Sequence, residues 1–331
     1  MQYEVSYRTY RRTLSTPLRT AHGLWAEREG LIVRLVDETG QTGYGEAAPI
    51  AWFGRETLSE VVEASRQLTG KRTDAELDAV PQALGSLRFA LASARETGPR
   101  PNPAIRLPVA ALLPAGRAAL DVLPARLDAG FLSLKWKVGV DRPEEELGLL
   151  DDVISSLPAY VKLRLDANGA WDRRQAQRWL ERCAERPIEF IEQPLAADDQ
   201  AGLIGLARDF PVTLALDESV VFLTEAARWQ AEGWPGVFVI KPALSGPLAE
   251  LEEWIGRTKA DVVISSAIES ALGRRGIVQR ALAGALTTRA LGLGVGGIFG
   301  DRLWDGPESG PWLDAYWCGS IDPEALWNAL S

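Results

Sequence analysis

The chain has 331 residues, of which 46% are hydrophobic and 24% charged, and its formal net charge is −9. These are ordinary values for a globular protein, and an acidic balance without long Lys or Arg runs argues against nucleic-acid or anionic-membrane binding. One histidine, His22, and two distant cysteines, Cys183 and Cys318, leave little material for a Ser-His-Asp triad, a zinc site or a disulfide framework. Acid–base chemistry must therefore rest on Lys, Asp and Glu. Because the N-terminus lacks the apolar core of a signal peptide, we expect a cytoplasmic protein.

The first hundred residues predict an α+β domain. Short strands with Gly-containing turns are predicted around Val5–Tyr10, Leu31–Asp37 and Gly43–Ala47. Two helices are predicted at about Glu56–Leu68 and Pro81–Glu96, the second with Pro81 in its first turn. The proline-rich stretch from Gly98 to Pro103 reads as a linker. We therefore assign residues 1–98 to the first domain.

After the linker, short apolar runs alternate with amphipathic stretches of helical length. They begin at intervals of roughly 25–30 residues, the length of one strand–helix unit. The eight runs are Leu107–Leu113, Phe131–Val138, Val161–Asp166, Ile188–Glu192, Val212–Asp217, Val237–Pro242, Asp261–Ser266 and Leu291–Val295. This pattern predicts a (β/α)8-type TIM barrel over residues 104–299. A doubly wound open sheet is disfavoured, because no Gly-x-Gly-x-x-Gly follows the first strand.

The last segment, residues 300–331, is rich in tryptophan, with Trp304, Trp312, Trp317 and Trp327. It is too apolar to be disordered. We expect it to pack back onto the N-terminal domain.

Three predicted barrel strands in succession end on a carboxylate: Asp166, Glu192 and Asp217. The strand ends of a parallel barrel converge on one mouth, and adjacent strands lie ~4.8 Å apart. Three anions at that spacing would repel strongly unless a cation neutralised them. All-oxygen ligands fit Mg²⁺ better than Zn²⁺. The sequence therefore predicts a magnesium site in the barrel mouth.

Lysines flank this predicted site. Lys135 and Lys137 alternate on the second strand and so point to the same side, and Lys241 ends the sixth strand across the mouth. A lysine inside an apolar strand is costly unless it faces a polar cavity. Burial beside a metal ion would lower the pKa of such an ammonium and make it a usable base.

These residues together resemble the enolase superfamily, specifically its muconate-lactonizing branch. The resemblance rests on Lys135-Trp136-Lys137, Asp166-Ala167-Asn168, Glu192-Gln193-Pro194, Asp217-Glu218-Ser219 and Lys241-Pro242. It implies an N-terminal capping domain over a barrel and Mg²⁺ held by Asp166, Glu192 and Asp217. It also implies that Lys137 and Lys241 are the acid–base or charge-stabilising pair, with Lys135 beside them.

Within that branch the chain looks most like the o-succinylbenzoate synthase family of menaquinone or phylloquinone biosynthesis. The supporting stretches run from Gly45 to Pro49, Phe53 to Thr57, Arg164 to Trp171 and Ile264 to Ser270. The resemblance implies Mg²⁺-dependent dehydration of a cyclohexadiene carboxylate. Candidate substrate-binding residues are Arg164, Asn168, Ser265, Ser266, Arg19 and Phe53. His22 is expected to be structural.

Two other activities stay open at this point. N-succinylamino acid racemases and dipeptide epimerases of the same branch would use the same lysines in a 1,1-proton transfer. Dipeptide epimerases usually carry Asp-x-Asp at the eighth strand, whereas this chain has Gly294-Val295-Gly296. A non-catalytic binding protein is the more distant alternative. We expect a small-molecule carboxylate substrate, with neither nucleic acid nor membrane as partner.

Overall fold

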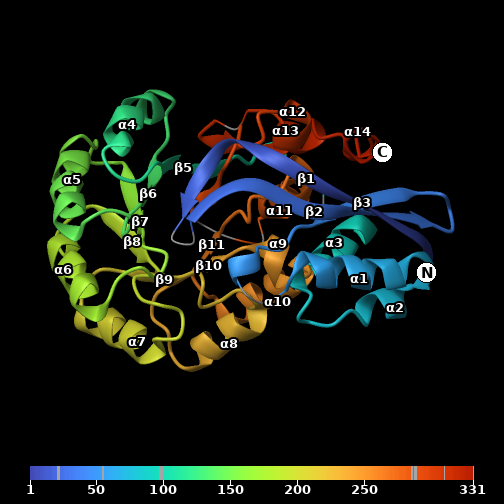
Figure 1. The fold of residues 1–331 in the computed structure, drawn as a ribbon, viewed down its shortest axis with the longest axis horizontal. Coiled ribbons are helices and arrows are strands. Elements are labelled where there is room, and N and C mark those ends of the chain that lie inside the picture. The colour runs from blue at the N-terminus through green and yellow to red at the C-terminus, as the bar shows by residue number, and fades with distance from the viewer. Residues whose placement is uncertain are drawn as a thin grey trace.

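The computed structural model describes residues 1–20, 23–53, 56–96, 100–284, 286, 289–308 and 310–330, with the backbone alone for Arg19 and Thr20. A barrel of parallel strands and outer helices lies beside an antiparallel sheet with its own helices (Figure 1). The prediction for His22 lies outside the described residues, as does the side chain of Arg19. In the described ranges, no helix is both long and apolar enough to cross a membrane.

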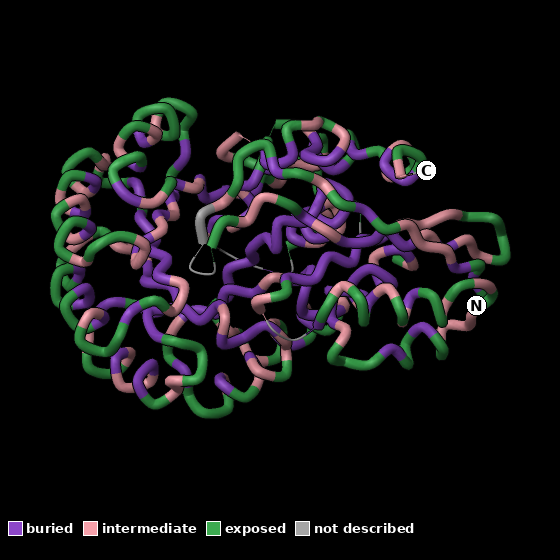
Figure 2. Tube along the Cα trace, viewed as in Figure 1, coloured by how far each residue is buried: buried purple, intermediate pink, exposed green. Residues whose placement is uncertain are grey.

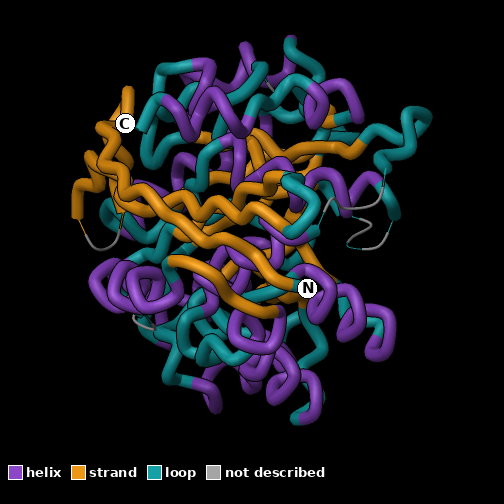
Figure 3. Tube along the Cα trace, turned by 90° about the vertical axis from the view of Figure 1, so that its right-hand side faces the viewer, coloured by secondary structure: helices purple, strands orange, loops and turns teal. Residues whose placement is uncertain are grey.

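The capping domain is built on a four-stranded sheet with strand order β3-β2-β1-β4. Its strands are β1 (Gln2–Thr20), β2 (Gly23–Asp37), β3 (Thr42–Ala47) and β4 (Gly70–Thr73). Figure 3 looks onto this domain and shows the strands side by side. The β1–β2 pair is much longer than predicted. The prediction missed its outer part, where the first five residues of β2 have no buried side chain. Without a buried face, the outer part of the ribbon carries no alternating pattern.

The outer part of this ribbon reaches the barrel. The Ser15 amide donates to the carbonyl of Ile298 at 2.8 Å, and the Ser15 hydroxyl donates to the carbonyl of Gly297 at 2.7 Å. Both carbonyls follow the last barrel strand, at the mouth. The ribbon therefore lies beside the mouth, as Figure 1 shows.

Helices α1 (Leu58–Leu68), α2 (Asp74–Asp78) and α3 (Gly85–Arg95) complete the domain. Helix α1 begins at a capping box in which Thr57 and Glu60 bond each other's backbone amides. Helix α3 begins at Gly85, four residues after the predicted start, and Pro81 lies in the preceding turn. A Cβ added at Gly85 would lie 2.0 Å from the carbonyl oxygen of Leu244 in the barrel. The close approach of the two domains thus leaves no room for a side chain at the first residue of this helix.

Eight parallel strands form the barrel in the described residues, in the order β12-β5-β6-β7-β8-β9-β10-β11. A bridge between Ser265 and Gly292 joins the two ends. The strands are β5 (Leu107–Leu113), β6 (Ser133–Lys137), β7 (Lys162–Asp166), β8 (Ile188–Glu192), β9 (Leu214–Leu216), β10 (Val237–Ile240), β11 (Val262–Ile264) and β12 (Leu291–Gly294). Each lies within a predicted apolar run. The predicted (β/α)8 barrel with an N-terminal capping domain is confirmed.

Helices follow the strands in alternation, and their outward faces are exposed (Figure 2). They are α4 (Ala118–Asp128), α5 (Pro143–Ser155), α6 (Arg173–Cys183), α7 (Gln200–Asp209), α8 (Leu223–Ala231), α9 (Pro242–Ser245), α10 (Leu248–Thr258) and α11 (Ala271–Leu282). The large apolar core lies between these helices and the strands. A second, small cluster fills the barrel interior, with Phe190, Ala215, Val237, Val239 and Val263.

The C-terminal segment contacts both domains. It contains α12 (Arg302–Asp305), β13 (Trp312–Leu313), α13 (Ala315–Gly319) and α14 (Pro323–Asn328). Trp304 lies against Tyr10, and Trp327 lies under the guanidinium of Arg8, and both partners belong to β1 of the capping domain. Strand β13, in contrast, pairs with β5, and Trp317 joins the barrel core. The segment therefore fastens the two domains together.

Candidate active site

The barrel mouth gathers the predicted charged residues because the strand register places them at one level. Lys137, Asp166 and Glu192 are lateral neighbours on β6, β7 and β8. Glu192 pairs with Ala215, and Asp217 follows two residues later on the same side. The side chains of Asp166, Glu192 and Asp217 are buried. A set of buried charges thus occupies one end of the barrel.

Lys135 bridges two of the carboxylates. Its Nζ lies 2.9 Å from Oδ2 of Asp166 and 2.7 Å from Oε1 of Glu192. Burial would lower the pKa of Lys135, but the neighbouring carboxylates outweigh it and raise that pKa. Lys135 therefore stays protonated and acts as a fixed positive charge.

The two carboxylates respond differently to the same lysine. Burial would raise the pKa of Asp166, but the charges of Lys135 and Lys137 hold it well below its usual range. Burial and the charge of Asp166 raise the pKa of Glu192 to about 8. The buried carboxylates of the mouth therefore compete for the positive charge of the neighbouring lysines.

Lys137 hydrogen-bonds Asn168 and forms a longer ion pair with Asp166. Its Nζ donates to Oδ1 of Asn168 at 2.7 Å, and Oδ2 of Asp166 is more distant at 3.6 Å. Nδ2 of Asn168 donates to Oε1 of Glu218 at 3.0 Å. Burial and the charge of Asp217 raise the pKa of Glu218 to about 7. Asn168, which has φ of 45°, therefore links Lys137 to the half-buried carboxyl group of Glu218.

Lys241 enters the mouth from the opposite side. Its ammonium pairs with Asp217 and lies 4.6 Å from the ring centroid of Phe53 in the capping domain. Phe53 belongs to a short 3₁₀ helix, η1 (Ala51–Phe53). The structure thus brings Phe53 from the capping domain to the lysine that ends the sixth strand.

Two residues that we did not predict as part of the site shape it. Gln193 is buried with φ of 38°, and its Oε1 accepts hydrogen bonds from the amides of Asp217 and Ser219. Its Nε2 donates to the carbonyl of Leu195. Glu218 supports Asn168, as described above. Both residues stand in quoted motifs, but the sequence does not show which hydrogen bonds they make.

The carboxylates do not form a ready coordination sphere. In the part of the chain that the structure describes, no three acidic side chains gather around one point. Their oxygens instead face the ammonium groups of Lys135 and Lys241. Three buried carboxylates on neighbouring strands nevertheless offer the hard, anionic oxygen donors that Mg²⁺ prefers. The three carboxylates therefore fit Mg²⁺ as ligands. The ammonium groups of Lys135 and Lys241 neutralise the charge of the same carboxylates.

Ser265 and Ser266, predicted to bind substrate, follow β11 and differ in their contacts. Ser265 lies on the same side of its strand as Val263, which belongs to the interior cluster, and its side chain lies against Gly292. The Ser266 hydroxyl donates to Oε1 of Glu269 at 3.0 Å and accepts from the Ile268 amide at 2.9 Å. Ser266 therefore shapes the loop, and Ser265 faces the interior.

Arg164, also predicted to bind substrate, lies away from the mouth. Its guanidinium pairs with Glu189 at 2.7 Å and donates to the carbonyl of Ala290 at 2.9 Å. Glu189 lies near the start of β8, and Ala290 precedes β12, at the end of the barrel opposite the mouth. This prediction is corrected, because the side chain is only 1% exposed and makes its contacts at the end of the barrel opposite the mouth.

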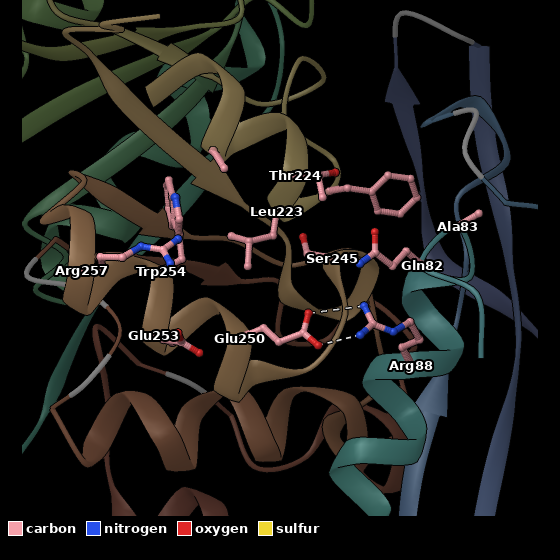
Figure 4. Close-up of a pocket in the computed structure, with 12 residues that line it drawn as sticks. Gln82, Ala83, Arg88, Leu223, Thr224, Ser245, Glu250, Glu253, Trp254 and Arg257 are labelled. Atoms are coloured by element: carbon pink, nitrogen blue, oxygen red, sulfur yellow. Dashed lines mark hydrogen bonds and ion pairs between the residues drawn. The ribbon is translucent and has the colours of Figure 1, made fainter. Parts of the chain in front are cut away.

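A hollow of about 440 Å³ lies elsewhere, on the outside of the barrel beside the capping domain (Figure 4). Its lining comes from α8, α9 and α10, from α3 and from the turn before α3, with the ion pair of Arg88 and Glu250 across it. None of the charged residues of the mouth lines it. It marks a second contact between the domains, away from the barrel mouth.

Comparison with known proteins agrees with this geometry. The profile of the family described as MenC, N-terminal domain, matches residues 7–97, and that of the family described as Enolase C-terminal domain-like matches residues 119–257. The o-succinylbenzoate synthase of Thermosynechococcus vestitus is 43% identical over 277 residues, covering 82% of this chain and 86% of the relative. The chain belongs to the o-succinylbenzoate synthase family. Another member, from Yersinia enterocolitica, is 33% identical and covers 76% of this chain and 78% of its own length.

Solved structures support the same family. The crystal structure of o-succinylbenzoate synthase from Thermosynechococcus elongatus, which has Mg in the active site, is 39% identical with a TM-score of 0.83. The alignment covers 98% of this chain and 99% of that chain. The L-Ala-D/L-Glu epimerase of Bacillus subtilis has a TM-score of 0.81 at 20% identity, covering 94% of this chain and 95% of the other. The second likeness shows a shared fold only.

Proposed function

We propose that this protein is an o-succinylbenzoate synthase that uses the charged mouth of the barrel. The reaction removes water from 2-succinyl-6-hydroxy-2,4-cyclohexadiene-1-carboxylate and forms 2-succinylbenzoate for menaquinone or phylloquinone biosynthesis. The observation that carries the activity is the 43% identity to a known synthase over 82% of the chain. The roles of individual residues are proposals that rest on the geometry of the mouth.

Asp166, Glu192 and Asp217 would hold Mg²⁺, the ion present in the related synthase. When bound, the ion neutralises the substrate carboxylate and stabilises the negative charge that proton removal adds to it. Lys135 contributes a permanent positive charge beside Asp166 and Glu192. The α-proton of a carboxylate is very weakly acidic, and these positive charges make its removal easier.

Lys137 is the proposed acid–base group. Its neutral amine takes the α-proton, so the C–H electron pair moves into the enediolate of the substrate. The resulting ammonium then gives the proton to the departing hydroxyl on the same face, the C–O bond breaks, and water and an aromatic ring are formed. Asn168 holds Lys137 at 2.7 Å and so fixes the amine that must serve both steps.

Lys241 would stabilise the enediolate from the opposite face. Its ammonium lies over the ring of Phe53, so the capping domain and the barrel together define this side of the cavity. An ammonium over the substrate ring gains further cation–π attraction as that ring becomes aromatic. Ser265, Asn168, Phe53 and Arg19 remain the proposed substrate contacts.

The direct test is formation of 2-succinylbenzoate from the cyclohexadiene acid, with and without EDTA. We expect turnover that EDTA abolishes and added Mg²⁺ restores. A second incubation with N-succinyl amino acids in D₂O follows α-proton exchange by mass. If the α-proton of N-succinyl amino acids exchanged but no 2-succinylbenzoate formed, the protein would be a racemase and not a synthase.

A further inference from the structure

Arg28 on β2 is a buried capping-domain residue that bonds the backbone of the barrel. Its side chain is only 2% exposed. Its guanidinium donates to the carbonyls of Ile268 at 3.1 Å and Ala267 at 3.2 Å. The same group donates to the carbonyls of Pro49 at 2.7 Å and Ala48. One planar cation thus ties the loop after β11 to the segment that leads to Phe53.

Glu46 on β3 holds the other end of the same loop. Its Oε2 accepts from the amides of Ser270 at 2.9 Å and Gly273 at 3.1 Å, and the Ser270 hydroxyl also donates to it. These amides belong to the first turn of α11, whose positive dipole end favours a carboxylate. Tyr10 donates to the other oxygen of Glu46. A capping-domain carboxylate therefore caps a barrel helix.

Between these two anchors the loop has an unfavourable backbone conformation. Ile268 has φ of 59°, in the left-handed region that β-branched residues rarely enter. Such a conformation persists only where the surroundings hold it in place. The contacts on both sides of Ile268 come from Arg28 and Glu46, and within the loop from Ser266 and Glu269.

We propose that Arg28 and Glu46 are positioning residues that hold the loop from Ser265 to Ser270 in its substrate-binding shape. Through this loop the capping domain sets the place of Ser265 in the barrel interior. The inference rests on the proposed function only in the statement that Ser265 contacts the substrate. The capping domain then does more than cover the mouth, because it also shapes one barrel loop that lines it.

The test uses the variants Arg28→Lys and Glu46→Gln of the full-length protein. Lysine keeps the charge of Arg28 but cannot bond four carbonyls in one plane. We expect KM to rise about tenfold or more with kcat changed less than about threefold, because loss of positioning weakens substrate binding more than proton transfer. A KM within about twofold of the wild type, at full folding, would overturn the proposal.

A matched control separates loop positioning from domain docking. Arg88→Gln breaks the ion pair with Glu250 at 2.6 Å, which joins the same two domains at the hollow of Figure 4. It touches no residue of the loop, so we expect KM to stay at the wild-type value. An equal rise in KM for this variant would show that any loosening of the interface suffices, and would overturn the role assigned to Arg28 and Glu46.

Amide hydrogen exchange tests the loop without any substrate. Exchange at residues 267–270 should be faster in Arg28→Lys than in the wild type and unchanged in Arg88→Gln. Unchanged exchange in Arg28→Lys would sink the proposal. If the wild type made no 2-succinylbenzoate, the proposed function would fail, while this exchange measurement would still decide whether Arg28 holds the loop.

Discussion

At the level of single residues, the lysines of the mouth have different surroundings and therefore different uses. Lys135 is enclosed by Asp166 and Glu192, which keep it protonated. Lys137 is more open, with 30% of its side chain exposed, and contacts the neutral amide of Asn168. The amine of Lys137 can therefore contact a substrate, whereas the ammonium of Lys135 is occupied by its ion pairs with Asp166 and Glu192. This difference in contacts is our reason for choosing Lys137 as the base.

Replacing Lys137 with Ala should lower kcat by about 10²–10⁴-fold or more, because a positioned acid–base group contributes that much. Mg²⁺ binding, measured by calorimetry, should persist because the three carboxylates remain. Lys162→Ala is a matched control, since Lys162 is exposed at the start of β7, away from the mouth. Retained turnover in Lys137→Ala would refute the assignment.

Glu56 is a buried carboxyl group whose ionisation should oppose folding. Its Oε1 accepts from the Ser86 amide at 2.9 Å, and its Oε2 is buried without a hydrogen-bond partner among the described residues. Burial raises its pKa from 4.5 to about 7. The folded state therefore binds the proton more tightly, and the stability that this group contributes is present at low pH and lost as pH rises through 7.

The variant Glu56→Gln tests this pH dependence. A shift of this size corresponds to about 3 kcal/mol, so the free energy of unfolding of the wild type should fall relative to that of Glu56→Gln by up to that amount between pH 4.5 and 8. Denaturant unfolding of both proteins at pH 5 and pH 8 measures the difference. A constant difference across this range would contradict an elevated pKa.

At the level of secondary structure, the sequence predicted the barrel strands well and the capping ribbon poorly. The barrel strands are short and mostly buried, and several are wholly apolar, so they show as distinct runs. The outer part of β2 has no buried face, and the start of α3 depends on contact between Gly85 and the barrel. Neither feature leaves a periodic pattern in the sequence. Local patterning therefore predicts elements only where burial is regular.

Gly85 gives a prediction at this level because it begins α3 against the carbonyl of Leu244 in α9. Gly85→Val should cost about 1–3 kcal/mol of stability by overpacking. It should also lower kcat, since α9 directly follows Lys241. Gly148→Ala is the control, because a Cβ there meets nothing within 4 Å and should be neutral or slightly stabilising. Thermal unfolding and turnover measure both effects, and equal behaviour of the two variants would contradict the close contact.

At the level of the whole molecule, the C-terminal segment joins the two domains. Trp304 and Trp327 pack on the capping domain, and β13 adds to the barrel beside β5. The Arg8 guanidinium both stacks on Trp327, at 4.5 Å, and donates to its carbonyl. The segment thus helps to keep the capping domain in place over the mouth.

Trp327→Ala should lower the free energy of unfolding by about 3–5 kcal/mol, as for other large buried aromatic residues. KM should also rise, because the capping domain loses part of its attachment. Tyr316→Ala is the control, since Tyr316 is 74% exposed and should change stability by no more than about 0.5 kcal/mol. Denaturant titrations compare the two, and a similar loss in both would show that Trp327 does not fasten the domains.

The sequence alone determined the fold class and the charged set of the mouth, because strand periodicity fixes which side chains share a face and the strand ends of a barrel converge. The different contacts of Lys135 and Lys137, the conformation of the loop that contains Ser266, and the place of Arg164 at the end opposite the mouth were decided only by the tertiary structure. Each of these depends on a partner that is distant in the chain: Glu192 for Lys135, Ala290 for Arg164, and the capping domain for the loop of Ser266. Spacing along a strand determines which face a side chain points to. Which group that side chain then contacts is determined only by tertiary packing.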